Sequence, residues 1–450
     1  MSQRQLFLAG YILFPGNHYI GAWRHPYSER DFNDRALFED VGRTLERAKF
    51  DMAFIPETLA HNPNFARFGL SNALKHEPTQ LAAVIAGATR HLGIGVTLSA
   101  SYNAPYHLAR TLGSLDQFSG GRVAWNIIMS KGEATRANFP FVEELDREQL
   151  YDRGDEVVES TVALWDSWSA DALVVDKQTG VFADPAQIAT PDYHGKYVQV
   201  RGPLTLPPSP QGKPVLIQAG DSPRGRRFGA KWAELVFAIE NNETDLRAKR
   251  DDLRRLAGEA GRDPDSIKLI AAVQPIIGET TEIARARQQF LNTLIGVDAA
   301  VAFLSQFVRV DLTGLDPDLR FTDAVAQRAT DATAGVRLLE NLTALAEGNG
   351  ETLGSELSLG EVARHFGASE FTPQLVGTGA EVADQLARLF EADAVDGYVL
   401  SPTHFPGAFD DIARAVVPEL QRRGIFRTEY ADTTLRGNLA GRRYSPGAGA

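Results

Sequence analysis

A polar turn at residues 219–225, with the sequence AGDSPRG, has the composition of a phosphate-binding loop. It follows an apolar run and precedes residues 224–232, which we predict to be a helix. Backbone N–H groups at a helix N-terminus attract anions, and the hydroxyl of Ser222 adds a donor. Asp221 belongs to the same turn. A serine N-cap with a glycine that eases the turn would give the same pattern without a ligand, so both interpretations stay open.

Three further polar residues stand at the ends of predicted strands. Parallel α/β folds place their sites at the carboxyl ends of the strands, so we expect these side chains to share one site. Each also has a structural alternative: a capping carboxylate, a hydroxyl bonded to its own turn, or a buried amide satisfied within the fold. The three are Glu57 after residues 51–56, Ser101 after residues 92–99, and Asn126 within residues 123–129.

Four ring-bearing side chains flank the expected mouth of the site. His18, Trp23 and His25 follow the first predicted strand, and His404 follows the last. We expect them to line a substrate pocket, with structural roles as the alternative. The chain has no cysteine and no His-Glu-x-x-His pattern, so we predict no metal site. No Gly-x-Gly-x-x-Gly motif is present either, which argues against a tightly held dinucleotide.

Strand and helix patterns alternate along almost the whole chain, which predicts a (β/α)8 TIM-like barrel. The predicted strands are residues 6–13, 51–56, 92–99, 123–129, 214–219, 234–239, 268–277 and 397–401. The predicted helices are residues 36–49, 79–89, the run that follows Ser101, 148–168, 224–232, 246–260, 281–294 and 409–423.

Two interruptions and a tail depart from this alternation. Residues 182–210 are rich in proline, glycine and aromatics and predict a β-ribbon insertion. Residues 297–373 hold short helical runs before the last strand and predict a helical insertion that could cover the barrel mouth. We therefore expect one barrel domain over residues 1–426. Residues 427–450 would form an extended C-terminal arm that contacts another subunit or is disordered.

Composition narrows the class of protein. A chain of 450 residues that is 43% hydrophobic can bury a large core. A net charge of −12 argues against a nucleic-acid groove or an anionic membrane surface, and no run approaches the ~18 apolar residues of a membrane span. The apolar run at the N-terminus is broken by Pro15-Gly16, so we expect a cytoplasmic protein and no signal peptide.

Several longer segments carry a family resemblance. The run SYNAPYHLARTLGSLDQFSGGRVAWNIIMS at residues 101–130 resembles the nitrilotriacetate/dibenzothiophene-sulfone monooxygenase branch of the bacterial luciferase-like flavin enzymes. AWRHP at residues 22–26, the Pro56-Glu57 pair and the run at residues 194–226 that ends in AGDSPRGR match the same branch. So do GTGAEVADQLARLF, DGYVLSP and VVPELQRRGIFRTEYADTTLRGNL. The resemblance covers nearly the full chain and is weakest over residues 297–373.

The resemblance implies a cofactor and a set of contacts. In this family a separate NAD(P)H-dependent reductase supplies reduced FMN, which reacts with O2 to form a C4a-hydroperoxyflavin that oxygenates the substrate. Position by position, it implies that Glu57, Ser101, Asn126, Tyr151 and the turn with Asp221 and Ser222 contact the flavin. The family has a histidine four residues before the tyrosine, where this chain has Arg147. Arg147 could pair with the phosphate, or the loop could be shifted so that it only supports the helix.

We therefore expect the oxygenase component of a two-component, FMNH2-dependent monooxygenase that oxygenates a small organic molecule next to nitrogen or sulfur. The resemblance also implies a homodimer or homotetramer. No catalytic residue is assigned. The nearest alternative is an F420-dependent oxidoreductase of the same superfamily; a metal-dependent hydrolase and a flavin carrier without catalytic activity are more remote.

Overall fold

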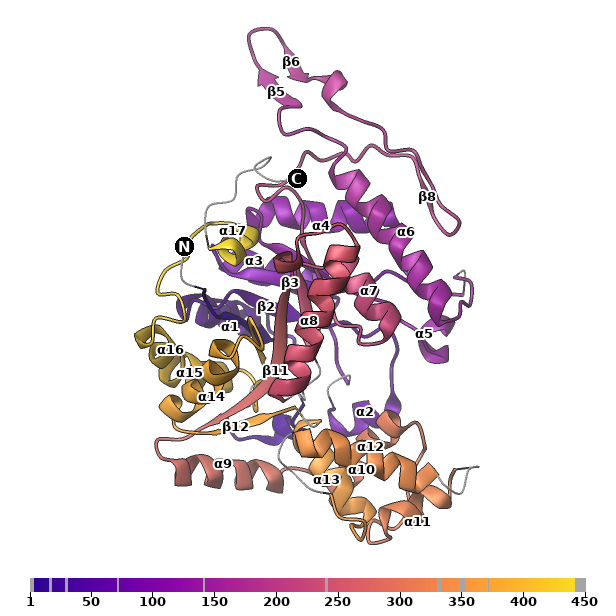
Figure 1. The fold of residues 1–450 in the computed structure, drawn as a ribbon, viewed down its shortest axis with the longest axis vertical. Helices are drawn as coiled ribbons and strands as arrows, with labels where there is room; N and C mark the ends of the chain where they lie inside the picture. Colours follow the sequence, from indigo (N-terminus) through magenta and orange to yellow (C-terminus); the bar gives the residue numbers. More distant parts are fainter. Residues whose placement is uncertain are drawn as a thin grey trace.

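Eight parallel strands close into a barrel in the computed structural model, which describes residues 4–15, 18–28, 31–70, 73–140, 142–238, 242–329, 334–348, 353–370 and 372–441. The neighbours around the barrel are β1–β2–β3–β4–β9–β10–β11–β13, and β13 pairs with β1 to close it. The predicted (β/α)8 fold is confirmed (Figure 1). The strands are β1 (Phe7–Tyr11), β2 (Met52–Ile55), β3 (Gly93–Ser99), β4 (Val123–Ile128), β9 (Val215–Gln218), β10 (Leu235–Ala238), β11 (Lys268–Ile277) and β13 (Gly397–Leu400).

Side chains alternate between the barrel interior and the layer beneath the helices, as the twofold strand period requires. One buried cluster fills the interior with residues such as Met52, Phe54 and Ile217. The intervening residues, among them Trp125 and Leu216, belong to the larger core that packs on the helices. Gly95 leaves room inside the barrel, because a Cβ there would lie 2.7 Å from the sulfur of Met52. The central interior is therefore packed and apolar.

Helices follow the strands at nearly every predicted position. The single predicted helix over residues 409–423 is instead two helices, because Pro418 cannot continue the first one. The helices around the barrel are α1 (Arg35–Arg47), α3 (Pro78–Ala88), α4 (Pro105–Ser119), α6 (Arg147–Trp165), α7 (Pro223–Trp232), α8 (Glu243–Glu259), α9 (Thr281–Thr293), α14 (Gly379–Glu391), α15 (Gly407–Ala415) and α16 (Val417–Arg422). Two short helices, α2 (Pro63–Phe68) and α5 (Glu133–Ala137), lie in the loops after β2 and β4.

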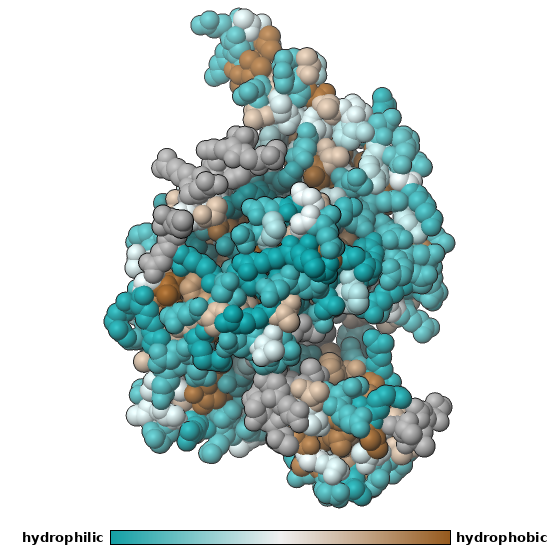
Figure 2. All heavy atoms as spheres, in the orientation of Figure 1, coloured by the Kyte–Doolittle hydropathy of each residue, from teal (hydrophilic) through white to brown (hydrophobic). Residues whose placement is uncertain are grey.

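Two antiparallel hairpins form the first insertion, between α6 and β9. They are β5 (Leu173–Asp176) with β6 (Val181–Ala183), and β7 (Tyr193–His194) with β8 (Gln199–Val200). The ribbon thus begins before the predicted residue 182. It projects from one end of the molecule and carries apolar side chains into solvent (Figures 1 and 2). Phe182 is 67% exposed there, and Val174 and Val175 are nearly half exposed.

A cluster of helices forms the second insertion, between α9 and α14. It consists of α10 (Val297–Val308), α11 (Phe321–Ala326), α12 (Ala334–Gly348) and α13 (Leu359–Ser369), packed on a core of their own. After it, β12 (Gln374–Gly377) adds to the outer half of β11 without joining the barrel. The cluster lies at the opposite end of the molecule from the hairpins, and a notch separates part of it from the body (Figures 1 and 2).

The helical insertion rests on the carboxyl end of the barrel. Ile20, after β1, donates its N–H to the carbonyl of Gly367 at 2.9 Å, and Asn62, after β2, donates to Gln306 at 2.6 Å. It therefore lies where the sequence predicts a cover, over the loops that follow the strands. No single helix of the described residues is long and apolar enough to span a membrane. Helices α9 and α10 reach that length and composition only together, and the pair is bent by 84°.

The described part of the tail, residues 427–441, differs from the expected extended arm. It carries the short helix α17 (Leu435–Ala440) and folds under the amino-terminal end of the barrel. Leu435 is buried against Gly93, and Arg436 forms a 2.7 Å ion pair with Glu234. Arg427 pairs with the buried Asp51. The tail thus closes the end of the barrel opposite the helical insertion, and residues 442–450 lie outside the described part.

Candidate functional site

The barrel interior becomes polar toward the carboxyl ends of the strands. Asn126 of β4 is buried, and its Nδ2 donates to the hydroxyl of Thr97 on β3 at 3.1 Å. Within the part of the chain that the structure describes, the Oδ1 of Asn126 has no hydrogen-bond partner. Neither has the hydroxyl of Ser401, just after β13, nor the Nε2 of Gln274 on β11. These atoms come from three parts of the barrel wall and lie out of contact with solvent.

Glu57 and Ser101 continue this polar rim. Each lies two residues after the end of its strand. Each also carries a buried side-chain oxygen that has no partner among the described residues, Oε2 of Glu57 and Oγ of Ser101. Burial raises the pKa of Glu57 to about 8, although the backbone N–H of Ser99 opposes the shift. At neutral pH the carboxyl group therefore keeps its proton and can donate a hydrogen bond. Arg153 of α6 fixes the loop that holds Ser101, since its guanidinium donates to the carbonyls of Ala100 and Ser101.

Unsatisfied buried polar atoms are rare in folded proteins, because each costs about 1–3 kcal/mol. Here several of them gather at one end of one barrel, at Glu57, Ser101, Asn126 and Ser401. A planar ligand with carbonyl and N–H groups along its edge would satisfy them. The donors and acceptors present, an amide, hydroxyls and a protonated carboxyl, match the edge of an isoalloxazine ring.

A cradle for an anion lies beside this rim, after β9. Ser222 is the N-cap of α7, and its Oγ accepts the N–H of Gly225 at 3.1 Å. The O–H of that hydroxyl remains able to donate to a ligand. Tyr151 of α6 covers the turn so closely that a Cβ on Gly220 would lie 2.6 Å from its hydroxyl, and one on Gly225 would lie 2.8 Å away. The two glycines are therefore required by close packing.

Charges around the cradle are mostly paired. Arg224 is held by Asp152 at 3.0 Å and Asp155 at 2.6 Å, and Arg226 by Asp252 at 3.2 Å, so neither has its full charge available for an anion. Asp221 pairs with the buried Lys249 at 2.8 Å, which offsets a negative charge that would otherwise oppose a phosphate. Arg147 begins α6 and is exposed. The structure describes no ion pair for it, and it precedes Tyr151 by one helical turn on the same face.

The seven predicted flavin contacts lie on one side of the barrel. Glu57, Ser101 and Asn126 belong to the neighbouring strands β2, β3 and β4, and the turn with Asp221 and Ser222 follows β9, the next strand. Arg147 and Tyr151 come from α6, which Arg153 ties to the loop after β3. Sequence reasoning missed Gln218, Gln274 and Ser401, although each is a polar residue at or near the end of a barrel strand and carried the same signal as Asn126.

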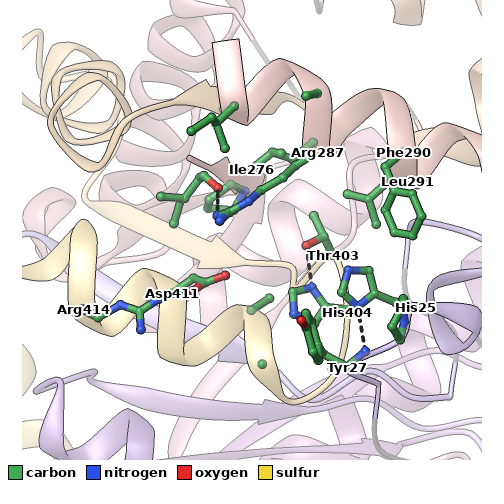
Figure 3. Close-up of a pocket in the computed structure, with 17 residues that line it drawn as sticks. His25, Tyr27, Ile276, Arg287, Phe290, Leu291, Thr403, His404, Asp411 and Arg414 are labelled. Atoms are coloured by element: carbon green, nitrogen blue, oxygen red, sulfur yellow. Dashed lines mark hydrogen bonds and ion pairs between the residues drawn. The ribbon is translucent and has the colours of Figure 1, made fainter. Parts of the chain in front are cut away.

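The structure separates the four residues expected to line one substrate mouth. His25 and His404 stack at 4.1 Å and border a pocket of about 690 Å3 between α9, β11 and α15, shown in Figure 3. His18 instead contacts Tyr11 at the end of β1, with ring centroids 5.3 Å apart. Trp23 is 42% exposed and donates to the carbonyl of Phe68. Only His18 therefore adjoins the barrel interior through a described contact.

Burial keeps both buried imidazoles neutral. It lowers the pKa of His18 to about 4 and that of His404 to about 3. Neither ring would carry a proton for acid catalysis near neutral pH. The described residues include no group of three or more His, Asp or Glu side chains that could hold a metal ion.

Glu57 makes a testable contribution to stability. Its folded pKa of about 8 exceeds its ordinary 4.5, so its contribution to folding is fully present below pH 4.5 and is lost as pH rises through 8. We expect Glu57→Gln in the flavin-free protein to remove this contribution to the pH dependence of the free energy of unfolding. The variant should therefore become increasingly stable relative to wild type as pH rises from about 5 to about 9. Urea unfolding across this range measures it. Glu340→Gln, at an exposed helical position, should track wild type; an equal slope for Glu57→Gln would show that Glu57 ionises normally.

The sequence of this chain matches a known protein family and several of its members. The luciferase-like monooxygenase family model matches residues 20–396. The chain is 42% identical to the dibenzothiophene-sulfone monooxygenase of Rhodococcus erythropolis (strain XP) over 97% of both chains. It is 33% identical to the N-acetyl-S-(2-succino)cysteine monooxygenase of Bacillus subtilis (strain 168), over 97% of this chain and 96% of the relative.

Solved structures with a similar fold support the same family. A riboflavin lyase, solved with modified FMN and riboflavin, is 30% identical, covers 99% of both chains and superposes with a TM-score of 0.84. The F420-dependent tetrahydromethanopterin reductase of Methanopyrus kandleri is 16% identical over 92% of this chain and 99% of its own, with a TM-score of 0.56, a likeness that shows the fold alone. The F420 alternative is thus the more distant one.

The predicted enzyme class, a flavin-dependent monooxygenase, and its cofactor, reduced FMN, are confirmed. Such enzymes are two-component systems that need a separate flavin reductase. The polar rim and the cradle fit this cofactor, and the family match covers most of the barrel. The chain therefore belongs to the luciferase-like monooxygenase family.

Proposed function

We propose that this chain oxygenates an organic sulfur compound, with the reduced FMN held by the polar rim and the cradle. Ser222 and the turn around it would hold the phosphate, while Asn126, Ser101 and the protonated Glu57 would hydrogen-bond the ring edge. The observation that supports this most is the set of buried oxygens without partners beside a helix N-terminus. When bound, reduced FMN supplies the electrons for the reaction with O2.

The chain's own residues would bind and orient the cofactor and exclude water from the site. The packed interior of Phe54 and Phe237, with ring centroids 4.7 Å apart, forms an apolar floor beneath the rim. The helical insertion covers the strand ends through Ile20 and Asn62. Excluding water in this way strengthens each hydrogen bond to the ligand and protects reactive species from hydrolysis.

A sulfur substrate is supported by two relatives. The names of both the sulfone monooxygenase and the succinocysteine monooxygenase state a sulfur compound, and the first is 42% identical over nearly the whole chain. We therefore propose that dibenzothiophene sulfone or a related aryl sulfone is accepted. An NAD(P)H-dependent flavin reductase would supply the reduced FMN by diffusion or transient contact.

The experiment supplies reduced FMN anaerobically to the full-length protein, adds O2 together with dibenzothiophene sulfone, and measures product and hydrogen peroxide. We expect product in proportion to O2 consumed and less peroxide than in the protein-free control. Consumption of reduced F420 without O2, in a parallel reaction, would instead favour the hydride-transfer alternative. If sulfones, thioethers and sulfonates all stay unchanged while peroxide forms as in the control, the proposal is wrong.

Arg147 is proposed to pair with the FMN phosphate, because it lies one turn from Tyr151 on the helix that covers the cradle. We expect Arg147→Ala to raise the dissociation constant of FMNH2 about 10-fold, and the effect to shrink at high salt since the residue is exposed. Anaerobic titration measures it. Arg136→Ala, on the neighbouring α5, is the matched control. An unaltered constant for Arg147→Ala would support the alternative that this residue only begins the helix.

We also propose a homodimer or homotetramer in the cytoplasm. The exposed apolar side chains of the projecting hairpins, including Phe182, support association, because such patches usually mark contact surfaces. Dependence on an NAD(P)H-driven reductase supports a cytoplasmic enzyme. Light scattering after size-exclusion chromatography would measure the assembly, and a monomer at micromolar concentration would contradict it.

A further inference from the structure

Lys75 carries a buried ammonium group. It lies in the loop between α2 and α3, which follows β2 at the carboxyl end of the barrel. Its Nζ has no hydrogen-bond partner among the described residues and lies out of contact with solvent. It faces the ring of Phe14, whose centroid is 5.7 Å from Nζ. A cation–π contact at this distance does not replace the water that an ammonium loses on burial.

The surroundings of Lys75 connect it to the barrel mouth. A chain of ring contacts leads outward from the interior, from Phe54 to Tyr11 at 5.5 Å and from Tyr11 to His18 at 5.3 Å. Lys75 is close enough to His18 for its charge to help lower the pKa of the imidazole. On its other side His18 faces Glu370, with Nε2 3.8 Å from the carboxylate. Lys75 thus lies near His18, whose ring contacts Tyr11 at the end of β1.

We propose that Lys75 is a specificity-determining residue that donates a hydrogen bond to a sulfonyl, sulfinate or carboxylate oxygen of the substrate. This inference rests on the proposed function and names the chemical group that the site selects. An oxygen acceptor would give Nζ the partner it lacks, and a charge-assisted hydrogen bond inside a dry site is among the stronger polar contacts. A thioether offers no such oxygen, so the residue would favour oxidised sulfur over reduced sulfur.

Two other observations support this assignment. Burial lowers the pKa of Lys75 to about 7, so the group is poised to take up its full charge when an acceptor arrives. Burial also raises the pKa of Glu370, the nearby carboxyl, to about 7, so part of this group is protonated near neutral pH. Its negative charge is therefore reduced near neutral pH, and its carboxylate faces Nε2 of His18 at 3.8 Å.

The test compares dibenzothiophene and its sulfone, which differ only in oxygen content, with benzenesulfonate as a second oxygen-bearing ligand. Binding to the anaerobic protein with reduced FMN is measured by calorimetry for dibenzothiophene sulfone, dibenzothiophene and benzenesulfonate. Lys75→Met keeps an unbranched apolar side chain as far as Cε and removes the donor, and Lys75→Arg restores a donor. Lys177→Met, an exposed lysine on the projecting hairpin, is the matched control.

We expect Lys75→Met to weaken the binding of the sulfone and of benzenesulfonate by about 10-fold to 100-fold. The affinities for dibenzothiophene and FMNH2 should stay within about twofold of wild type. Lys75→Arg should recover part of the loss, and Lys177→Met should bind as wild type does. Equal losses for all three ligands, or no loss for either oxygen-bearing ligand, would overturn the proposal. If Lys75→Met loses affinity for benzenesulfonate but wild type oxygenates no sulfur compound, the role of Lys75 in binding oxygen acceptors is supported and the proposed substrate class is wrong.

Discussion

Replacing Ser222 with aspartate is expected to weaken FMNH2 binding by about 100-fold while leaving the protein as stable as wild type. Aspartate and serine are equally good N-caps, so the new side chain can still accept the N–H of Gly225 that Ser222 accepts at 3.1 Å. Its carboxylate, however, would face the phosphate at the place where the hydroxyl now offers a donor. Like charges about 4 Å apart near a protein surface repel by several kcal/mol, which corresponds to about 100-fold or more in affinity.

Ser222→Asn separates the charge from the shape of the side chain, because asparagine also caps helices and carries no charge. We expect it to bind FMNH2 within about 10-fold of wild type. Anaerobic fluorescence titration measures both variants, and urea unfolding checks that both fold. If Ser222→Asp binds FMNH2 as wild type does, the turn is only a helix cap and the phosphate lies elsewhere.

Replacing Arg122 with methionine is expected to cost about 3–5 kcal/mol of stability, because each buried acceptor left without a donor costs about 1–3 kcal/mol. Arg122 follows two glycines with positive φ at the end of α4, in the Ser-Gly-Gly-Arg sequence. Its buried guanidinium makes five hydrogen bonds, to the carbonyls of Ala86, Thr89, Leu92 and Ser119 and to the hydroxyl of Thr89. One side chain thus ties the end of α3 and the starts of β3 and β4 together.

The loss follows because methionine would leave those carbonyls buried and without donors. Urea unfolding at neutral pH measures it, and Arg110→Met, at an exposed position of the same helix, should change stability by less than about 0.5 kcal/mol. The folded fraction of Arg122→Met should still bind FMNH2, because the residue lies at the amino-terminal ends of the strands. A loss as small as that of Arg110→Met would mean that water replaces the guanidinium at little cost.

The Ser-Gly-Gly-Arg sequence shows how far sequence reasoning reached. The glycines predict the end of a helix, since the chain must turn with positive φ there, and the structure confirms it. That the arginine reaches back to residues 86–92 could not be predicted, because these partners lie about 30 positions away and become neighbours only when the barrel closes. Arg224 gives the same lesson: its sequence context favours a phosphate ligand, yet Asp152 and Asp155 of α6 occupy its guanidinium.

The sequence by itself determined the eight strands, most of the helices and the position of the cradle. These follow from apolar periodicity and from an N-cap whose partner is three residues away, and such short-range patterns are set by the local backbone. Only the tertiary structure decided that His25 and His404 lie in a pocket apart from His18 and that residues 427–441 close the amino-terminal end of the barrel. It also decided that the ammonium of Lys75 is buried without a hydrogen-bond partner among the described residues. The physical reason is that burial and charge pairing depend on segments far apart in the chain, which meet only in the folded barrel.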